Sequence, residues 1–215
     1  MGKLHLEILD PERRNIFTRL SAFRAAGFLS GGTALALQLG HRISYDFDIF
    51  CKEEISDRFG AKIKKIVDIK EVLVNSSDEF TFLGKDDVKI SFVFYPFDLE
   101  KYLLEFPESS LKLLSPLGIA ATKAYALNRR NAWRDYVDLY VILKRGIVGL
   151  EDIMRESREV FGELFNEKLF LAQLVYVEDI SDAEISGTEM LEPATLPEIK
   201  RFFEKEIDAY LAAKI

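Results

Sequence analysis

Residues 28–51 read FLSGGTALALQLGHRISYDFDIFC, and this stretch indicates a strand, a glycine turn, a helix and a second strand in succession. The first two residues predict the first strand, and the glycine pair after them predicts a tight turn. The run from Ala34 to Leu39 predicts a two-turn helix that ends at Gly40. Alternating side chains from Tyr45 to Cys51 have the period of a β-strand. A short helix therefore connects two strands.

The second strand carries two carboxylates, Asp46 and Asp48, which are separated by one residue. Because side chains alternate along a strand, both carboxylates point to the same side. Neighbouring carboxylates repel each other, and a divalent cation relieves the repulsion; Mg²⁺ suits two carboxylates combined with substrate phosphates. Taken alone, the pair is equally consistent with a strand that has an exposed polar face.

The glycine turn is a candidate anion site. Gly31, Gly32 and Thr33 offer backbone N–H groups and a hydroxyl at the start of a helix, where the helix dipole favours anions such as phosphate. Taken alone, the turn has a simpler interpretation, because glycine pairs close many turns that bind nothing.

The rest of the chain predicts an α+β fold, with a mixed-sheet core over residues 1–107 and a helical region over residues 108–215. Proline and capping signals start helices at Asp10 and Ser115, and the first helix is expected to end at Gly27. A further helix is expected over residues 56–68, with strands over 69–74, 79–83 and 88–95, the last two forming a hairpin. Helices are expected over 116–130, 133–144, 150–160, 166–177 and 197–214, with a loop over 181–194.

Composition excludes several classes of protein. The chain has 215 residues, a formal charge of −7 and a single cysteine, Cys51, so no disulfide can form within it and no Cys/His zinc cluster is present. The sequence has neither the apolar segment of a signal peptide nor an uninterrupted membrane span. We therefore expect a globular protein of the reducing cytoplasm, without membrane partners.

Charge is distributed unevenly along the chain. From Lys123 to Arg145 there are six basic residues and two acids, whereas from Glu178 to Asp208 there are ten acids and three bases. An acidic protein binds nucleic acid poorly through its overall field, so a polyanionic ligand would need a local basic patch.

Two ordered motifs together resemble a known family. The spacing Gly31-Gly32-Thr33, twelve residues, Asp46-Phe47-Asp48 resembles the polymerase-beta-like nucleotidyltransferase superfamily, and the string GGTALALQLGHRISYDFDIF is similar to its AbiEii/AbiGii toxin-type branch. That branch has a later pattern like K…R…RDxxDLxxL, which Lys123 and the run from Arg134 to Leu139 match. The resemblance covers about Phe28 to Leu143 and implies a nucleotidyltransferase-like mixed sheet followed by helices that complete the active site.

The resemblance implies roles for individual residues. The triphosphate is expected at Gly31, Gly32 and Thr33, and the metal at Asp46 and Asp48. Lys123 would neutralise phosphate charge, and Asp138 would orient Lys123 or the nucleotide.

Five residues have weaker or alternative assignments. Arg42 and Ser44 are candidates for contact with phosphate or base, although Arg42 could equally pair with a surface acid. The alternative for Arg134 and Asp138 is an ion pair between successive helix turns. We expect Asp135 on the helix surface or as a supporting partner.

The resemblance implies transfer of a nucleoside monophosphate from a Mg²⁺-bound NTP to an acceptor hydroxyl, on a tRNA end or a protein. It also implies a toxin that acts beside an antitoxin protein. One residue departs from the pattern: Ser91 stands where such enzymes commonly carry a third carboxylate, and serine neither binds a second metal strongly nor accepts a proton well at pH 7. The alternative is a catalytically inactive nucleotide- or partner-binding module of the same fold.

Overall fold

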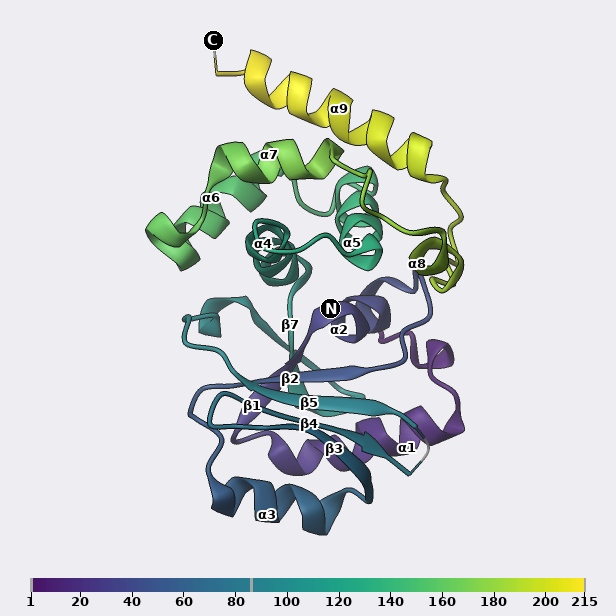
Figure 1. The fold of residues 1–215 in the computed structure, drawn as a ribbon, viewed down its shortest axis with the longest axis vertical. Helices are drawn as coiled ribbons and strands as arrows, with labels where there is room; N and C mark the ends of the chain where they lie inside the picture. Colours follow the sequence, from purple (N-terminus) through teal and green to yellow (C-terminus); the bar gives the residue numbers. More distant parts are fainter. Residues whose placement is uncertain (1, 86, 215) are drawn as a thin grey trace. The chain divides into compact units, whose positions relative to one another are not determined.

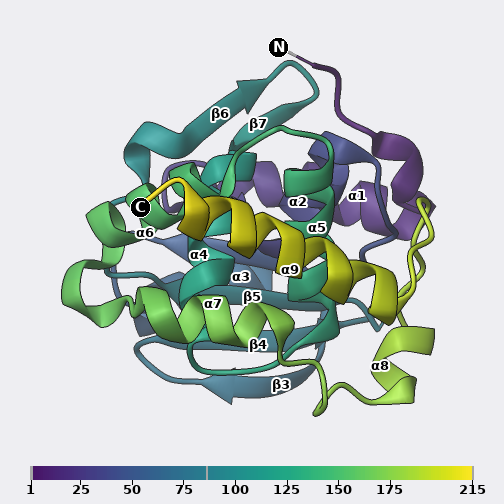
Figure 2. The same cartoon turned by 90° about the horizontal axis from the view of Figure 1, so that it is seen from above.

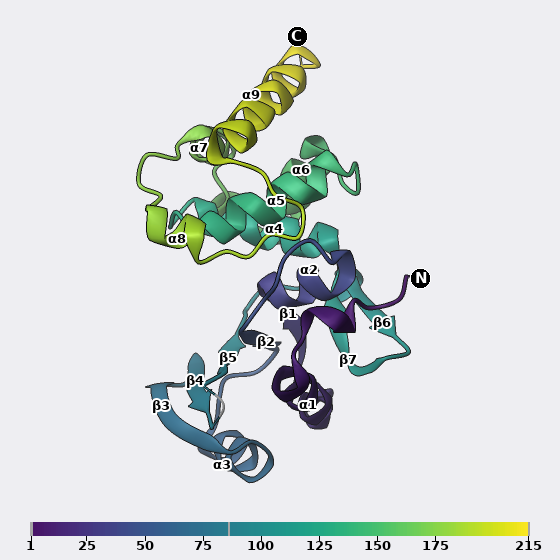
Figure 3. The ribbon, with the colours of Figure 1, turned by 90° about the vertical axis from the view of Figure 1, so that its right-hand side faces the viewer.

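The structure is a computed structural model that describes residues 2–85 and 87–214. The chain divides into two compact units, Met1–Ser115 and Pro116–Ile215. In the first unit the described strands form one mixed sheet in the order β3-β4-β5-β2-β1-β7-β6, which can be followed across Figure 3. Their bounds are β1 (Gly27–Ser30), β2 (Phe47–Cys51), β3 (Ile69–Asn75), β4 (Glu79–Gly84), β5 (Lys89–Phe94), β6 (Leu103–Phe106) and β7 (Ser109–Leu114).

Helices cover both faces of this sheet. Figure 1 shows α1 (Pro11–Leu20) and α3 (Asp57–Ile66) on one face and α2 (Gly31–Leu39) on the other. Side-chain caps stabilise the starts of α1 and α3. The carboxylate of Asp10 and the hydroxyl of Ser56 accept hydrogen bonds from backbone N–H groups that the first helical turn leaves unpaired. Aromatic rings fill the space beneath them, including the stacked pair Phe17 and Phe47.

The register of the central strands places three polar side chains in one row. β1 pairs with β2 in antiparallel fashion, with Ser30 opposite Asp48, and β2 pairs with β5 in parallel fashion, with Asp48 opposite Ser91. Directly opposed residues project from the same face of a sheet. Asp48 therefore lies between two serines.

The second unit consists of helices. They are α4 (Pro116–Leu127), α5 (Trp133–Lys144), α6 (Leu150–Phe161), α7 (Glu167–Val175), α8 (Asp182–Ser186) and α9 (Leu196–Ala212). The helix α4 packs against α5, α6 and α7, and α9 lies across α5, α6 and α7 (Figure 2). The helices α4 and α5 have apolar residues over most of their circumference, and they are therefore buried on most sides.

The predicted α+β class, with a mixed sheet followed by helices, is confirmed. The first helix ends at Leu20 and not at Gly27, and a 3₁₀ turn over Ser21–Phe23 follows it. The strands β6 and β7 were not predicted, and both lie in the first compact unit, which ends at Ser115. In the expected loop, Ser181 and Glu184 form a capping box that starts α8.

Within the described residues, no helix combines the length and the apolar character that crossing a bilayer requires.

Candidate active site

The glycine turn meets the carboxylate strand directly. Gly31 has a φ of +68°, and a Cβ atom built on it would lie 2.7 Å from Oδ2 of Asp48. A Cβ atom on Gly32 would overlap the Nη2 atom of Arg42. Two glycines therefore allow the backbone at the start of α2 to approach both an acidic and a basic side chain, which larger residues would prevent.

Arg42 is buried at this turn. Only 2% of the residue is exposed, and Nη1 donates to the carbonyl of Ile43 at 3.1 Å. Arg42 is therefore not a surface residue, and its contact with a phosphate, a base or an acidic side chain stays a prediction. The contact with Gly32 holds a permanent positive charge beside backbone N–H groups, and this combination suits an anion.

Hydroxyl groups connect the turn to the loop before β2. Thr33 donates to the backbone carbonyl of Asp46, and its Oγ1 lies 2.7 Å from Oγ of Ser44. Because a hydroxyl has one proton to donate, Ser44 is the donor in the second contact. These bonds fix the position of Asp46 relative to the start of α2. Contact of Ser44 with a phosphate or a base stays a prediction.

Asp48 lies in β2, and Asp46 directly precedes the first residue of this strand. Both are partly buried, whereas Phe47 between them is fully buried, which agrees with the predicted alternation. Lys89, which the sequence analysis did not single out, places Nζ 3.5 Å from Oδ2 of Asp46. No cluster of three or more His, Cys, Asp or Glu side chains suited to a metal occurs among residues 2–85 and 87–214. The two carboxylates fit a Mg²⁺ ion that completes its shell with phosphate oxygens and water, which is how proteins commonly hold this ion.

Two serines on the neighbouring strands complete this row of the sheet. Ser91 is 6% exposed and lies in register beside Asp48, so a serine does stand next to the carboxylates. Ser30 is fully buried, makes no side-chain cap to α2, and its Oγ has no hydrogen-bond partner among the described residues. The sequence analysis missed Ser30, although a serine at a helix N-cap was a recognisable signal.

A second polar cluster lies in the helical unit. Nζ of Lys123 lies 2.6 Å from Oδ1 of Asp135 and 2.8 Å from Oδ2 of Asp138, and Arg130 reaches the other oxygen of Asp135 at 3.2 Å. Lys123 is 7% exposed and Asp138 is fully buried. Asp135 is buried too, so its expected place on the helix surface is wrong, and its role as a partner of Lys123 is observed.

The cluster is balanced in charge. In these ion pairs two cations face two carboxylates; Lys123, Asp135 and Asp138 are buried, whereas the side chain of Arg130 is 65% exposed, and the pairing compensates part of the cost of burial. The structure therefore brings Lys123 and Asp138 together. A single site that also includes Asp46 and Asp48, which belong to the other compact unit, stays a prediction.

Comparisons with known proteins identify the family of this chain and show which folds are similar to it. A family described as nucleotidyl transferase AbiEii toxin, type IV toxin–antitoxin system, matches residues 16–214. The protein aq_aa25 of Aquifex aeolicus (strain VF5) is 30% identical over 191 residues, 86% of this chain and 87% of that protein. MenT4, the nucleotidyltransferase toxin Rv2826c of Mycobacterium tuberculosis H37Rv, has a similar fold, with a TM-score of 0.60 at 17% identity over 91% of this chain and 80% of that chain. JHP933 from Helicobacter pylori has a TM-score of 0.50 at 17% identity over 99% of this chain and 100% of that chain. The chain belongs to the AbiEii family of nucleotidyl transferase toxins of type IV toxin–antitoxin systems.

Proposed function

We propose that this protein transfers a nucleoside monophosphate from a Mg²⁺-bound NTP to an acceptor hydroxyl. The observation that carries the proposal is the close approach of Gly31 to Asp48, because it places a turn suited to an anion beside a carboxylate suited to a metal ion. Family membership supports the same reaction class.

The residues of the chain can supply most of what this reaction needs. The acceptor oxygen forms a bond to the α-phosphorus and loses its proton to water, the bond to pyrophosphate breaks, and negative charge develops on the leaving group. The N–H groups of the turn and the Arg42 guanidinium would hold phosphate oxygens, and Lys123 would neutralise the leaving group. Mg²⁺, held by Asp46 and Asp48, would polarise the phosphoryl oxygens and align the substrate.

The acceptor and the partner are finer parts of the proposal. The acceptor hydroxyl belongs to an RNA, such as a tRNA end, or to a protein side chain, and an antitoxin protein opposes the activity in the cell. Incubation with each labelled NTP, Mg²⁺ and either total RNA or cell protein tests both classes of acceptor. We expect label in one macromolecular fraction and none with Asp48→Asn. Absence of label in both fractions would contradict catalysis.

Ser91 supports one alternative, a catalytically inactive module that binds a nucleotide or a partner protein. Ser91 lies beside Asp48 in the sheet. Its hydroxyl stands where catalysis would gain from a carboxylate that acts as a general base or binds a second metal ion. Calorimetry with a nonhydrolysable ATP or GTP analogue separates the two functions. Binding without transfer would favour the inactive nucleotide-binding module, and absence of binding would favour a partner-binding protein.

A further inference from the structure

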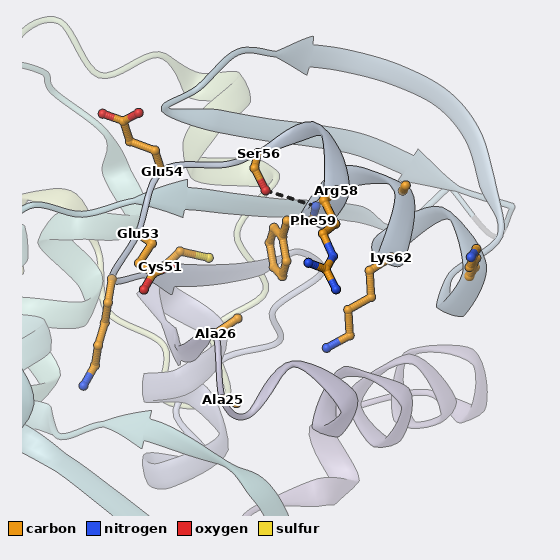
Figure 4. Close-up of a pocket in the computed structure, with 12 residues that line it drawn as sticks. Ala25, Ala26, Cys51, Glu53, Glu54, Ser56, Arg58, Phe59 and Lys62 are labelled. Atoms are coloured by element: carbon orange, nitrogen blue, oxygen red, sulfur yellow. Dashed lines mark hydrogen bonds between the residues drawn. The ribbon is translucent and has the colours of Figure 1, made fainter.

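A cavity of about 640 Å³ lies in the first unit, where β2 ends and α3 begins (Figure 4). Cys51, the last residue of β2, lines it. Because Cys51 follows Asp48 by three residues and side chains alternate along a strand, the cavity lies against the opposite face of the sheet from the carboxylates. It is therefore separate from the candidate active site.

One wall of the cavity is cationic. Arg58, Lys62 and Lys65 line it from one ridge of α3, and neighbouring positions on such a ridge are about 5 to 6 Å apart. Figure 4 shows Arg58 and Lys62 extending from α3 into the space toward Ala25 and Ala26. Lys62 donates to the carbonyl of Ala22 at 3.3 Å, which is a neutral partner. Over residues 2–85 and 87–214, none of the three cations forms an ion pair with a carboxylate.

Of the remaining lining, the floor of the cavity is apolar and one margin is acidic. Ala25, Ala26 and Phe59 present carbon atoms to the cavity. Burial raises the pKa of the Cys51 thiol to about 12, so this group stays neutral and does not repel an anion. Glu53 and Glu54 line the margin and offer carboxylate oxygens that accept hydrogen bonds.

We propose that this cavity binds a nucleoside polyphosphate at a site distinct from the candidate active site. The phosphates lie along Arg58, Lys62 and Lys65, whose spacing suits several charges in a row. The nucleobase and the sugar cover the apolar part of the cavity. At its margin, Glu53 and Glu54 accept hydrogen bonds from sugar hydroxyl groups or from amino groups of the nucleobase. The volume falls within the range of small-ligand sites.

The acidic margin favours a nucleotide over an RNA strand. A continuing sugar–phosphate chain would bring further phosphates beside the carboxylates of Glu53 and Glu54, whereas a single nucleotide brings only its base and sugar there. The inference does not depend on nucleotidyl transfer, since it uses none of the residues assigned to that reaction.

Calorimetry with ATP in EDTA tests the proposal, because chelation removes metal-dependent binding at Asp46 and Asp48. Arg58→Gln combined with Lys65→Gln should weaken ATP binding at least tenfold. The matched control combines Lys64→Gln with Lys85→Gln, which removes the same charge outside the cavity lining, and should change the affinity less than twofold. Ala61→Phe fills the cavity without changing charge and should also weaken binding at least tenfold.

Several outcomes would overturn the proposal. ATP binding that is absent from the wild-type chain, or unaltered in the cavity variants, would remove the site. Tripolyphosphate that binds as tightly as ATP would show a simple anion site with no role for the apolar floor. If a single-stranded RNA binds, its binding requires Arg58 and Lys65, and ATP does not bind, the cavity is a nucleic-acid groove.

One outcome would support the separate site. It is ATP binding that persists in the Asp46→Asn variant in EDTA, even if nucleotidyl transfer is never observed.

Discussion

At the scale of single residues, Asp46 experiences two opposed electrostatic effects. Repulsion from Asp48 destabilises the metal-free fold, whereas Lys89 at 3.5 Å stabilises it, and both side chains of that ion pair are partly exposed. We expect Asp46→Asn to change the free energy of unfolding by less than about 1 kcal/mol without metal, since exposed pairs contribute little. The same change should weaken Mg²⁺-dependent nucleotide binding, which calorimetry with a nonhydrolysable NTP measures.

Asp68→Asn is the matched control, because Asp68 is also a partly exposed carboxylate beside basic side chains, Arg19 and Lys85. It should leave nucleotide binding unchanged. A large fall in the melting temperature of Asp46→Asn without metal would mean that Asp46 is a structural residue, and its assignment to the metal would fail.

Ser30 gives a second prediction at this scale. Its buried hydroxyl has no partner among the described residues, so its desolvation is not compensated. Ser30→Ala should therefore leave the free energy of unfolding unchanged or raise it by up to about 1 kcal/mol. If the hydroxyl serves the nucleotide or the metal beside Asp48, affinity for the Mg²⁺-bound analogue should fall severalfold.

The chain offers a matched control in Ser157, which is also fully buried with an unpartnered hydroxyl, in the helical unit. Ser157→Ala should have a similar effect on thermal unfolding and none on nucleotide affinity. If Ser30→Ala and Ser157→Ala have equal affinities for the Mg²⁺-bound nucleotide analogue, Ser30 has no role in nucleotide binding.

At the scale of elements, the turn into α2 depends on glycine for its conformation. Gly31→Ala adds a Cβ atom 2.7 Å from Asp48 at a φ of +68°. The left-handed backbone alone costs about 1 to 2 kcal/mol, so we expect at least that loss in denaturant unfolding, together with weaker nucleotide binding. Gly60→Ala is the control, because Gly60 lies inside α3 with no atom within 4 Å of its added Cβ, and it should stabilise by up to about 1 kcal/mol. A tolerated Gly31→Ala would contradict the proposed close approach.

The helix pair α4 and α5 depends on its buried ion pairs. Lys123→Met would leave the carboxylates of Asp135 and Asp138 buried with one cation removed. Breaking such a cluster costs about 3 to 5 kcal/mol, which chemical denaturation measures. Lys144→Met, an exposed lysine at the end of α5, should change stability little. A loss of transfer in Lys123→Met is therefore informative only if the remaining folded fraction is measured in parallel.

At the scale of the whole molecule, uneven charge predicts where an RNA acceptor would bind. Arg129 lies over the ring of Tyr125 at 3.6 Å, and Arg130 is 65% exposed at its side chain, between α4 and α5. If both neutralise RNA phosphates, Arg129→Ala with Arg130→Ala should weaken binding and reduce the slope of log K against log salt by about 1.5. Arg201→Ala with Lys205→Ala, within the acidic stretch, should leave the slope unchanged. An absence of salt-dependent RNA affinity would favour a protein acceptor.

The sequence by itself determined the local features of this protein. Strand alternation predicted that Asp46 and Asp48 share one side, and capping and proline signals predicted the starts of α1 and α4. The motif spacing was sufficient to predict the family, which the comparisons confirm. These features follow from backbone geometry that repeats every few residues, so they can be inferred without knowing which segments meet.

Only the tertiary structure decided which residues surround these motifs. The pairing of β7 with β1 joins segments that are distant in sequence. The burial of Arg42 against Gly32 and the contact of Lys123 with Asp135 join nearer segments, but they depend on how those segments pack. The sequence leaves two positions open for Asp135, the helix surface or a supporting contact, because pairing and burial of charged groups depend on neighbours that no local pattern specifies. Strand order and side-chain burial are set by the free energy of packing the whole unit, which is why they required the folded chain.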